Sequence, residues 1–225
     1  MCKCDGNSES SCKCDGSCCC GGSCSCKSSS DPRLLFCIVG KSASGKDSLC
    51  NALKERTGIK FVCSYTDRPI RCGEVDGVEH FFVSKEDMDK LFERDDILAK
   101  TQIGEYRYCA TVESLGAETK LYIVDPNGIK YIRRNQNKLG IFPVVLYIDC
   151  ADDIRFERAR LRGDREDIIK KRFADEALQF DEFLAWLRGT DRDLFHFTYR
   201  SDDCSFEELY ATVASDIHRV IGNYI

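Results

Sequence analysis

The sequence lacks a long apolar run and has no strong excess of charge of either sign. No stretch approaches the roughly 18 apolar residues of a membrane-spanning helix. Met1 is the only large apolar residue before Leu34, so we expect no hydrophobic signal peptide. The 33 basic and 38 acidic residues give a net charge of −5, unlike a general nucleic-acid binder. We expect a soluble, cytoplasmic protein with no nucleic-acid or membrane partner.

Residues 1–30 lack the apolar side chains that build a core. They contain nine Cys, nine Ser and four Gly, so we expect the segment to be disordered without a crosslink. Its Cys-x-Cys and Cys-Cys spacing resembles that of metallothioneins, and dense thiolates favour Zn²⁺ or Cu⁺. The predicted soft-metal ligands are Cys2, Cys4, Cys12, Cys14, Cys18, Cys19, Cys20, Cys24 and Cys26. The alternative is a low-complexity extension that binds no metal.

The remaining 195 residues, 31–225, alternate apolar runs with helical patterns. The apolar runs, which are typical of buried parallel strands, are 34–39, 121–124, 144–148 and 195–199. The helical patterns lie near 49–56, 127–134, 152–160, 166–186 and 206–221. This alternation predicts an α/β fold with a parallel sheet covered on both faces. Residues 63–113 interrupt the rhythm, and we interpret them as an insertion that holds a ligand.

A glycine-rich loop follows the first apolar run. Gly40, four residues and then Gly45-Lys46 fit the Walker A pattern, in which backbone N–H groups surround a β-phosphate and the lysine reaches the β/γ oxygens. Asp47 stands where the pattern has Ser or Thr as an Mg²⁺ ligand, and a carboxylate is also a good hard-oxygen ligand. The predicted ATP-binding residues are Gly40, Ser42, Ala43, Ser44, Gly45, Lys46, Asp47 and Ser48, with Mg²⁺ on Asp47.

The segment 64–83, SYTDRPIRCGEVDGVEHFFV, lies downstream of this loop and resembles the monophosphate-binding signature of guanylate kinases. The resemblance runs from about Leu34 to Ile221. It implies a P-loop nucleoside-monophosphate-kinase fold with a parallel-sheet core, a monophosphate-binding insertion at 63–113 and a helical lid at about 152–175. It also implies that Arg68 and Arg71 hold the acceptor phosphate, helped by Tyr108, and guanidinium forks suit a dianionic phosphate well.

The resemblance further assigns lid arginines that neutralise the charge developed in phosphoryl transfer. Lys46, Arg158, Arg162 and Arg172 form the predicted catalytic group. No strong base is needed, because the acceptor phosphate is already a nucleophile.

The residues that would read the acceptor base match the family only in part. Ser64 and Asp125 match, and His80 replaces a phosphate-contacting Tyr. The predicted monophosphate-binding residues are Ser64, Arg68, Arg71, His80, Tyr108 and Asp125. Counting without gaps from Arg71 to Tyr108 places Ala99 where the family has a base-reading Glu, and Gln102 or Glu105 is the alternative acceptor if the loop shifts.

The resemblance implies ATP-dependent phosphorylation of GMP or dGMP. Two alternatives from other classes of function remain open. One is a non-catalytic guanylate-kinase-like module that binds a protein partner. The other is a thiol-rich metal-binding protein that acts through residues 1–30.

Overall fold

The computed structural model describes residues 33–71, 73–116, 118–189 and 194–224. All of them belong to one compact unit, Pro32–Ile225. The nine cysteines predicted to bind soft metals lie outside the described residues. Within the described ranges, no three His, Cys, Asp or Glu side chains are grouped so as to hold a metal ion. No helix in the same ranges has the length and apolarity of a membrane span.

Five parallel strands form the central sheet. In spatial order they are β2 Lys60–Phe61, β7 Lys120–Ile123, β1 Arg33–Val39, β8 Ile141–Asp149 and β9 His196–Arg200. Strand β1 is therefore central, paired with β7 on one side and with β8 on the other. Apolar runs predicted four of the five strands. The two-residue β2 is too short to leave a pattern in the sequence.

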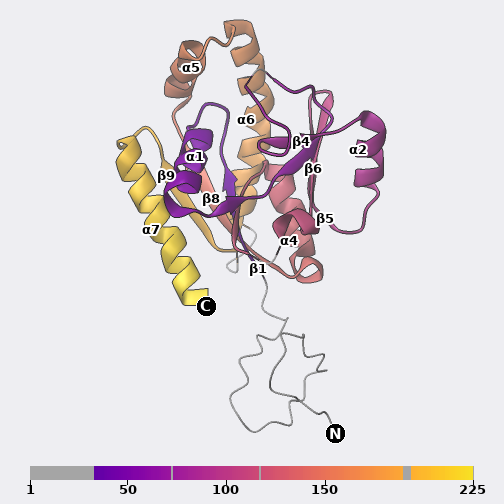
Figure 1. Cartoon of the computed structure of the whole chain (residues 1–225). Helices are drawn as coiled ribbons and strands as arrows, with labels where there is room; N and C mark the ends of the chain where they lie inside the picture. The colour runs from indigo at the N-terminus through magenta and orange to yellow at the C-terminus, as the bar shows by residue number, and fades with distance from the viewer. Residues whose placement is uncertain (1–32, 72, 117, 190–193, 225) are drawn as a thin grey trace, which may run out of the picture. The chain divides into compact units, whose positions relative to one another are not determined.

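Helices cover both faces of this sheet, as predicted. The helices of the described residues are α1 Lys46–Thr57, α2 Lys85–Phe92, α3 Val112–Leu115, α4 Pro126–Leu139, α5 Asp152–Leu161, α6 Glu166–Gly189 and α7 Phe206–Tyr224, of which α2 and α3 pack against the second sheet described below. Figure 1 shows α1 and α7 on one side of the central sheet and α4 and α6 on the other. Helix α4 runs five residues beyond the predicted Arg134, because it ends only where Gly140 adopts a left-handed conformation (φ 60°).

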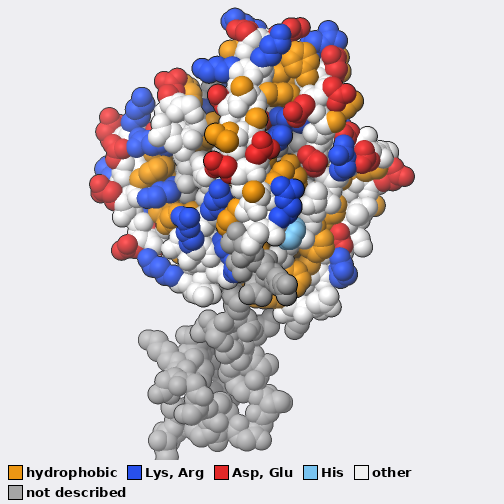
Figure 2. Space-filling model, turned by 180° about the vertical axis from the view of Figure 1, so that it is seen from behind, with side chains coloured by type: hydrophobic (Ala, Val, Ile, Leu, Met, Phe, Trp, Pro, Cys, Tyr) orange, Lys and Arg blue, Asp and Glu red, His pale blue; other side chains and the backbone are white. Residues whose placement is uncertain are grey.

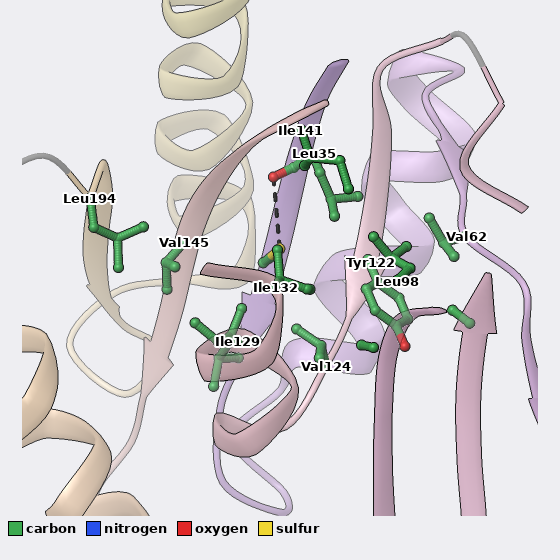
Figure 3. Packing of buried hydrophobic residues seen from close by; sticks show 14 of the residues in the cluster. Leu35, Val62, Leu98, Tyr122, Val124, Ile129, Ile132, Ile141, Val145 and Leu194 are labelled. Carbon is green, nitrogen blue, oxygen red and sulfur yellow. Dashed lines mark hydrogen bonds between the residues drawn. The ribbon is translucent and has the colours of Figure 1, made fainter. Parts of the chain in front are cut away.

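Side chains of β1 alternate between two hydrophobic clusters. Leu34, Phe36 and Ile38 pack in one cluster with buried residues of α1 and α7. Leu35, Cys37 and Val39 belong to the other cluster, with residues of α4 and α6. Figure 3 shows part of this second cluster, in which Ile129 and Ile132 of α4 lie near Leu35 and Val145. Because both faces of the strand are covered, its apolar run is continuous rather than alternating with polar residues.

The segment that interrupts the α/β rhythm forms a second sheet. Its strands, in spatial order, are β4 His80–Phe82, β3 Ser64–Thr66, β6 Tyr106–Thr111 and β5 Ile97–Ile103. Strand β3 is parallel to β4 and antiparallel to β6, which pairs antiparallel with β5. This sheet and α2 lie on the opposite side of the core from α7 (Figure 1). It presents the segment 64–83 beside the core.

Charged residues of both signs are spread over the surface. Figure 2 shows Lys and Arg side chains interspersed with Asp and Glu on the face opposite to that of Figure 1. This mixture agrees with the small net charge of −5.

Candidate active site

The Walker loop connects the end of β1 to the start of α1. Gly40 has no room for a side chain, because a Cβ there would lie 2.7 Å from the Ile148 carbonyl oxygen. Ala43 and Gly45 adopt left-handed conformations, with φ of 60° and 90°. Left-handed residues of this kind let a loop curve around an anion, and α1 then adds the positive end of its dipole. The local backbone therefore has the form of a phosphate cradle.

A cavity of about 500 Å³ opens beside this loop. It is lined by Ala43, Gly45, Asp47, Ser48, Arg158, Arg162, Ser201, Cys204, Phe206 and Leu209. The Lys46 side chain is only 18% exposed, and its Nζ lies 3.6 Å from the Asp47 carboxylate. Asp47 and Ser48 are both exposed at the first turn of α1, so a carboxylate and a hydroxyl are presented together. These oxygens are the ligand types that Mg²⁺ prefers, and the donor set therefore fits an Mg²⁺-bound triphosphate.

Arg158 is hydrogen-bonded to the phosphate loop itself. Its guanidinium donates to the carbonyl oxygens of Ser44 at 3.3 Å and Ser201 at 2.8 Å, and to the Ser201 hydroxyl at 3.0 Å. The Ser201 hydroxyl also donates to the Ser44 carbonyl, at 2.6 Å. The sequence predicted Arg158 as a lid arginine. In this structure it ties α5 to the phosphate loop and lines the cavity.

Arg162 and Arg172 converge on one carboxylate. Asp164 accepts from Arg162 Nη2 at 2.5 Å and from Arg172 Nη1 at 3.2 Å. These hydrogen bonds and charges hold the pKa of Asp164 below its ordinary value, with Arg162 as the largest contributor. Arg162 also lines the cavity. The two predicted lid arginines are thus brought together, with Asp164 as the counter-ion that the sequence analysis did not assign.

A second group of predicted residues gathers on the second sheet. Arg68 is 5% exposed and pairs through its fork with Glu74, with N···O distances of 2.7 and 2.8 Å. Its Nε donates to the Tyr108 hydroxyl at 3.3 Å. The hydrogen bonds from Arg68 lower the pKa of Glu74 to about 2. Arg71 lies exposed at the rim, where its backbone N–H donates to Glu74 at 2.8 Å.

Ser64 and His80 are joined across the paired strands β3 and β4. The Ser64 Oγ and His80 Nδ1 atoms lie 2.8 Å apart, and the imidazole meets the Tyr108 ring edge-on with centroids 5.7 Å apart. Burial, followed by the charge of Arg68, lowers the pKa of His80. Both effects favour the neutral ring, which can act as a hydrogen-bonding partner.

Asp125 sits between the second sheet and the lid-side helix α6. Its carboxylate caps α4 by accepting from the N–H groups of Asn127 and Gly128. It also accepts from the Thr101 hydroxyl at 3.0 Å and the Gln179 amide at 3.2 Å. Asp125, predicted as a monophosphate-binding residue, thus also caps a helix. Thr101 and Gln179 were not predicted.

Ala99, the residue that the ungapped count places at the base-reading position, has no polar side-chain group to offer a base. It is 2% exposed and belongs to the hydrophobic cluster that contains Leu35. The pairing of β5 with β6 shifts register between Ile97 and Ala99 and is then continuous from Ala99 to Ile103. Gln102 and Glu105, the alternative acceptors, are exposed, and Gln102 donates to the Gly104 carbonyl of the following turn.

Two further residues at the loop were missed by sequence reasoning. Glu176 of α6 accepts from the Ser42 N–H, and Arg155 of α5 donates to the Ser42 carbonyl at 2.8 Å. The signal for Arg155 was present, since it lies three residues before Arg158 on a helix and so shares its face. Glu176 left no such signal, because it is 134 residues away from its partner.

Comparisons with known proteins were made against this geometry. A sequence model of a family described as guanylate kinase matches residues 33–190. A guanylate kinase of Carboxydothermus hydrogenoformans is 25% identical over 195 residues, covering 84% of this chain and 87% of the relative. One of Clostridioides difficile is 42% identical over 119 residues, 50% of this chain and 58% of the relative. One of Symbiobacterium thermophilum is 44% identical over 75 residues, 32% and 36% of the two chains.

A solved structure, the crystal structure of guanylate kinase from Anaplasma phagocytophilum, has the same fold. The TM-score is 0.59 at 17% sequence identity, and the match covers 84% of this chain and 86% of that one. The predicted P-loop nucleoside-monophosphate-kinase fold is thereby confirmed.

Proposed function

This chain is a kinase that belongs to the guanylate kinase family, and we propose that it transfers the γ-phosphoryl group of ATP to GMP or dGMP. The proposal rests on one observation: the domain contains two separate groups of residues that are suited to binding phosphate. One is the left-handed loop with Lys46 beside a cavity of about 500 Å³. The other is the cluster of Arg68, Tyr108, Ser64 and His80 on the second sheet.

At the donor site, the loop would bind the β-phosphate through its N–H groups, and Lys46 would contact the β- and γ-phosphate oxygens. Asp47 and Ser48 are the residues that would hold Mg²⁺, which when bound supplies charge neutralisation on the phosphates. The lysine's present partner, Asp47, lies 3.6 Å away, close enough to compensate its charge before the nucleotide arrives. The apolar side chains of Phe206 and Leu209 form the part of the cavity suited to a base.

At the acceptor site, Arg68 and Arg71 would bind the monophosphate. Glu74 holds the buried Arg68 fork in one orientation, which reduces the entropy lost when the phosphate binds. An oxygen of the acceptor phosphate then attacks the γ-phosphorus as the bond to the bridging oxygen of ADP breaks. Arg158, Arg162 and Arg172 would stabilise the charge that develops between donor and acceptor. Because the nucleophile is already anionic, alignment and charge neutralisation are sufficient.

Guanine is the proposed acceptor base because Ser64 belongs to this cluster and Asp125 is hydrogen-bonded to Thr101, which pairs with Tyr108 across β5 and β6. Guanine carries N–H donors at N1 and N2, and the Asp125 carboxylate is an acceptor already oriented by Thr101 and Gln179. We place the reaction in the cytoplasm. The described cysteines Cys37, Cys50, Cys63, Cys109, Cys150 and Cys204 are free thiols, which suits a reducing compartment.

A coupled ADP-release assay over the eight common ribo- and deoxyribonucleoside monophosphates tests the proposal. We expect GMP and dGMP to give the highest kcat/KM. Lys46→Ala serves as the negative control, because it removes the charge at the phosphates but leaves the core unchanged. Preference for another base would overturn the guanine assignment. The absence of ADP release with every acceptor would favour the non-catalytic alternative.

A further inference from the structure

The phosphate loop contains a turn in which Ala43 occupies a position where glycine is preferred. The Ser44 N–H donates to the Lys41 carbonyl at 3.2 Å, so Ser42 and Ala43 are the central residues of a four-residue turn. Ala43, the second of these, has φ of 60° and is the only non-glycine residue with positive φ among those described. Glycine is preferred at such a position, since a Cβ makes the left-handed conformation cost on the order of 1–2 kcal/mol.

Two side chains hold the backbone immediately before Ala43. Arg155 Nε donates to the Ser42 carbonyl at 2.8 Å, which fixes the plane of the peptide between Ser42 and Ala43. The orientation of that plane about the Ala43 N–Cα bond is the φ angle of Ala43. Glu176 accepts from the Ser42 N–H at 3.0 and 3.1 Å and also from the Ser42 hydroxyl. Both backbone polar groups of Ser42 are therefore bound by side chains.

The two clamping side chains also hold each other. Arg155 Nη2 donates to Glu176 at 2.7 Å, and Arg155 Nη1 to Asp152 at 2.5 Å. The Arg155 guanidinium is 1% exposed and lies 3.9 Å from the centroid of the Phe173 ring. Burial keeps water from competing for these hydrogen bonds, and the aromatic face fixes the plane of the fork.

We propose that Glu176 and Arg155 are positioning residues that hold Ala43 in its left-handed conformation and so keep the phosphate loop ready for ATP. Neither residue needs to touch the nucleotide. This inference rests on the proposed function for its ligand. It adds a requirement that the Walker pattern does not contain, because the clamp comes from α5 and α6 on the lid side of the fold.

The inference makes a specific prediction about rescue. Glu176→Gln keeps the shape of the side chain but loses the charge that binds Arg155 and the Ser42 N–H. We expect affinity for a non-hydrolysable ATP analogue with Mg²⁺ to fall about tenfold, the size of one charge-assisted hydrogen bond. Glycine adopts positive φ without the Cβ penalty, so Ala43→Gly should restore the affinity of the Glu176→Gln variant to within about threefold of wild type.

Calorimetric titration of the full-length chain measures these affinities, and thermal unfolding of each variant reports its fold. Glu182→Gln, an exposed charge loss on the same helix, is the matched control and should bind as wild type does. Ala43→Gly alone should bind within about threefold of wild type. The inference would be wrong if Glu176→Gln bound the ATP analogue with wild-type affinity. It would also be wrong if the double variant Glu176→Gln, Ala43→Gly bound it no more tightly than Glu176→Gln alone. Absence of ATP binding by wild type would instead overturn the proposed donor.

Arg155→Lys is the independent second variant. Lysine keeps a positive charge near Glu176 but cannot donate to Glu176 and the Ser42 carbonyl from one planar fork. We expect weakened ATP binding that Ala43→Gly again restores. Weakened binding without rescue would show that Arg155 acts on the loop by some route other than the conformation of Ala43, and the inference would be wrong.

Discussion

Thr101 and Asp125 are joined by a hydrogen bond, with 3.0 Å between the Thr101 hydroxyl and the Asp125 carboxylate. The bond links β5 of the second sheet to the N-terminus of α4, and it orients the carboxylate proposed to read the acceptor base. Thr101→Val keeps the shape of the side chain but removes the donor. We expect the KM for GMP to rise roughly three- to tenfold with a smaller change in kcat, since one neutral-to-charged hydrogen bond is lost. Thr212→Val, on the exposed surface of α7, is the control for a lost hydroxyl.

Ala99→Glu should destabilise the protein rather than sharpen its selectivity. The site is 2% exposed and lies in a hydrophobic cluster, so the new carboxyl group would be buried among apolar side chains. The expected loss in the free energy of unfolding is about 3 kcal/mol or more. Denaturant titration measures it, with Gln102→Glu at an exposed position of the same strand as the control. A stable Ala99→Glu protein with increased preference for GMP over AMP would contradict this prediction and would place position 99 at the acceptor base.

Asp47→Asn should raise the Mg²⁺ concentration that the reaction requires. If the carboxylate is a metal ligand, the amide will raise the Mg²⁺ concentration for half-maximal rate, and the defect will shrink when Mg²⁺ is saturating. The measurement is a set of rate-against-Mg²⁺ titrations at fixed ATP. Superimposable curves for the two proteins would transfer the ligand role to Ser48.

Arg162→Ala should lower kcat far more than it raises the KM for GMP. In this structure Arg162 is paired with Asp164 and is about half exposed, so its contact with the reacting phosphates has to be made when the lid closes. Arg165→Ala removes an arginine that is 78% exposed and paired with Asp167 in the same lid, and it should leave both constants near wild type. An unchanged kcat with a raised KM would make Arg162 a binding residue.

Glu74 predicts a pH dependence of stability. Arg68 lowers the pKa of this carboxyl from 4.5 to about 2, so its contribution is complete above about pH 5 and is lost as the pH falls from 4.5 toward 2. Glu74→Gln should flatten the dependence of unfolding free energy on pH in that window. Glu105→Gln, at an exposed turn, should leave the curve unchanged. If the unfolding free energy of the Glu74→Gln protein fell with pH in the same way as that of wild type, the pH dependence could not be assigned to Glu74.

The fold was largely predictable because its signals are local. The run from Leu34 to Val39 is apolar throughout since both faces of β1 are covered, and such a run needs no knowledge of distant residues. The same is true of the loop, where Gly40, Gly45 and Lys46 lie within seven residues. Helix ends were less certain because the polar last turn of α4 resembles a loop, and only the left-handed Gly140 ends it.

The site was less predictable because it depends on partners that are distant in the sequence. Glu176 reaches Ser42 across 134 positions, and Arg155 is an arginine in the core, where composition alone leads one to expect an apolar residue. Ala99 and Thr101 are two residues apart on β5, yet one is buried in the core and the other contacts Asp125. Both positions lie in one unbroken pairing of β5 with β6 and on the same face of the strand, so the strand pattern alone does not separate these outcomes.

The central place of β1 also determines which part of the molecule can move. Its backbone is bonded to β7 and β8, and its side chains are buried on both faces, so its amide hydrogens should exchange with solvent only through global unfolding. The phosphate loop begins at the next residue after Val39. The donor phosphates would therefore be presented from slowly exchanging backbone. Because Arg155, Arg158 and Glu176 bind α5 and α6 to the loop, we expect the approach of donor and acceptor to come from displacement of the second sheet and of the α5–α6 connection that carries Arg162.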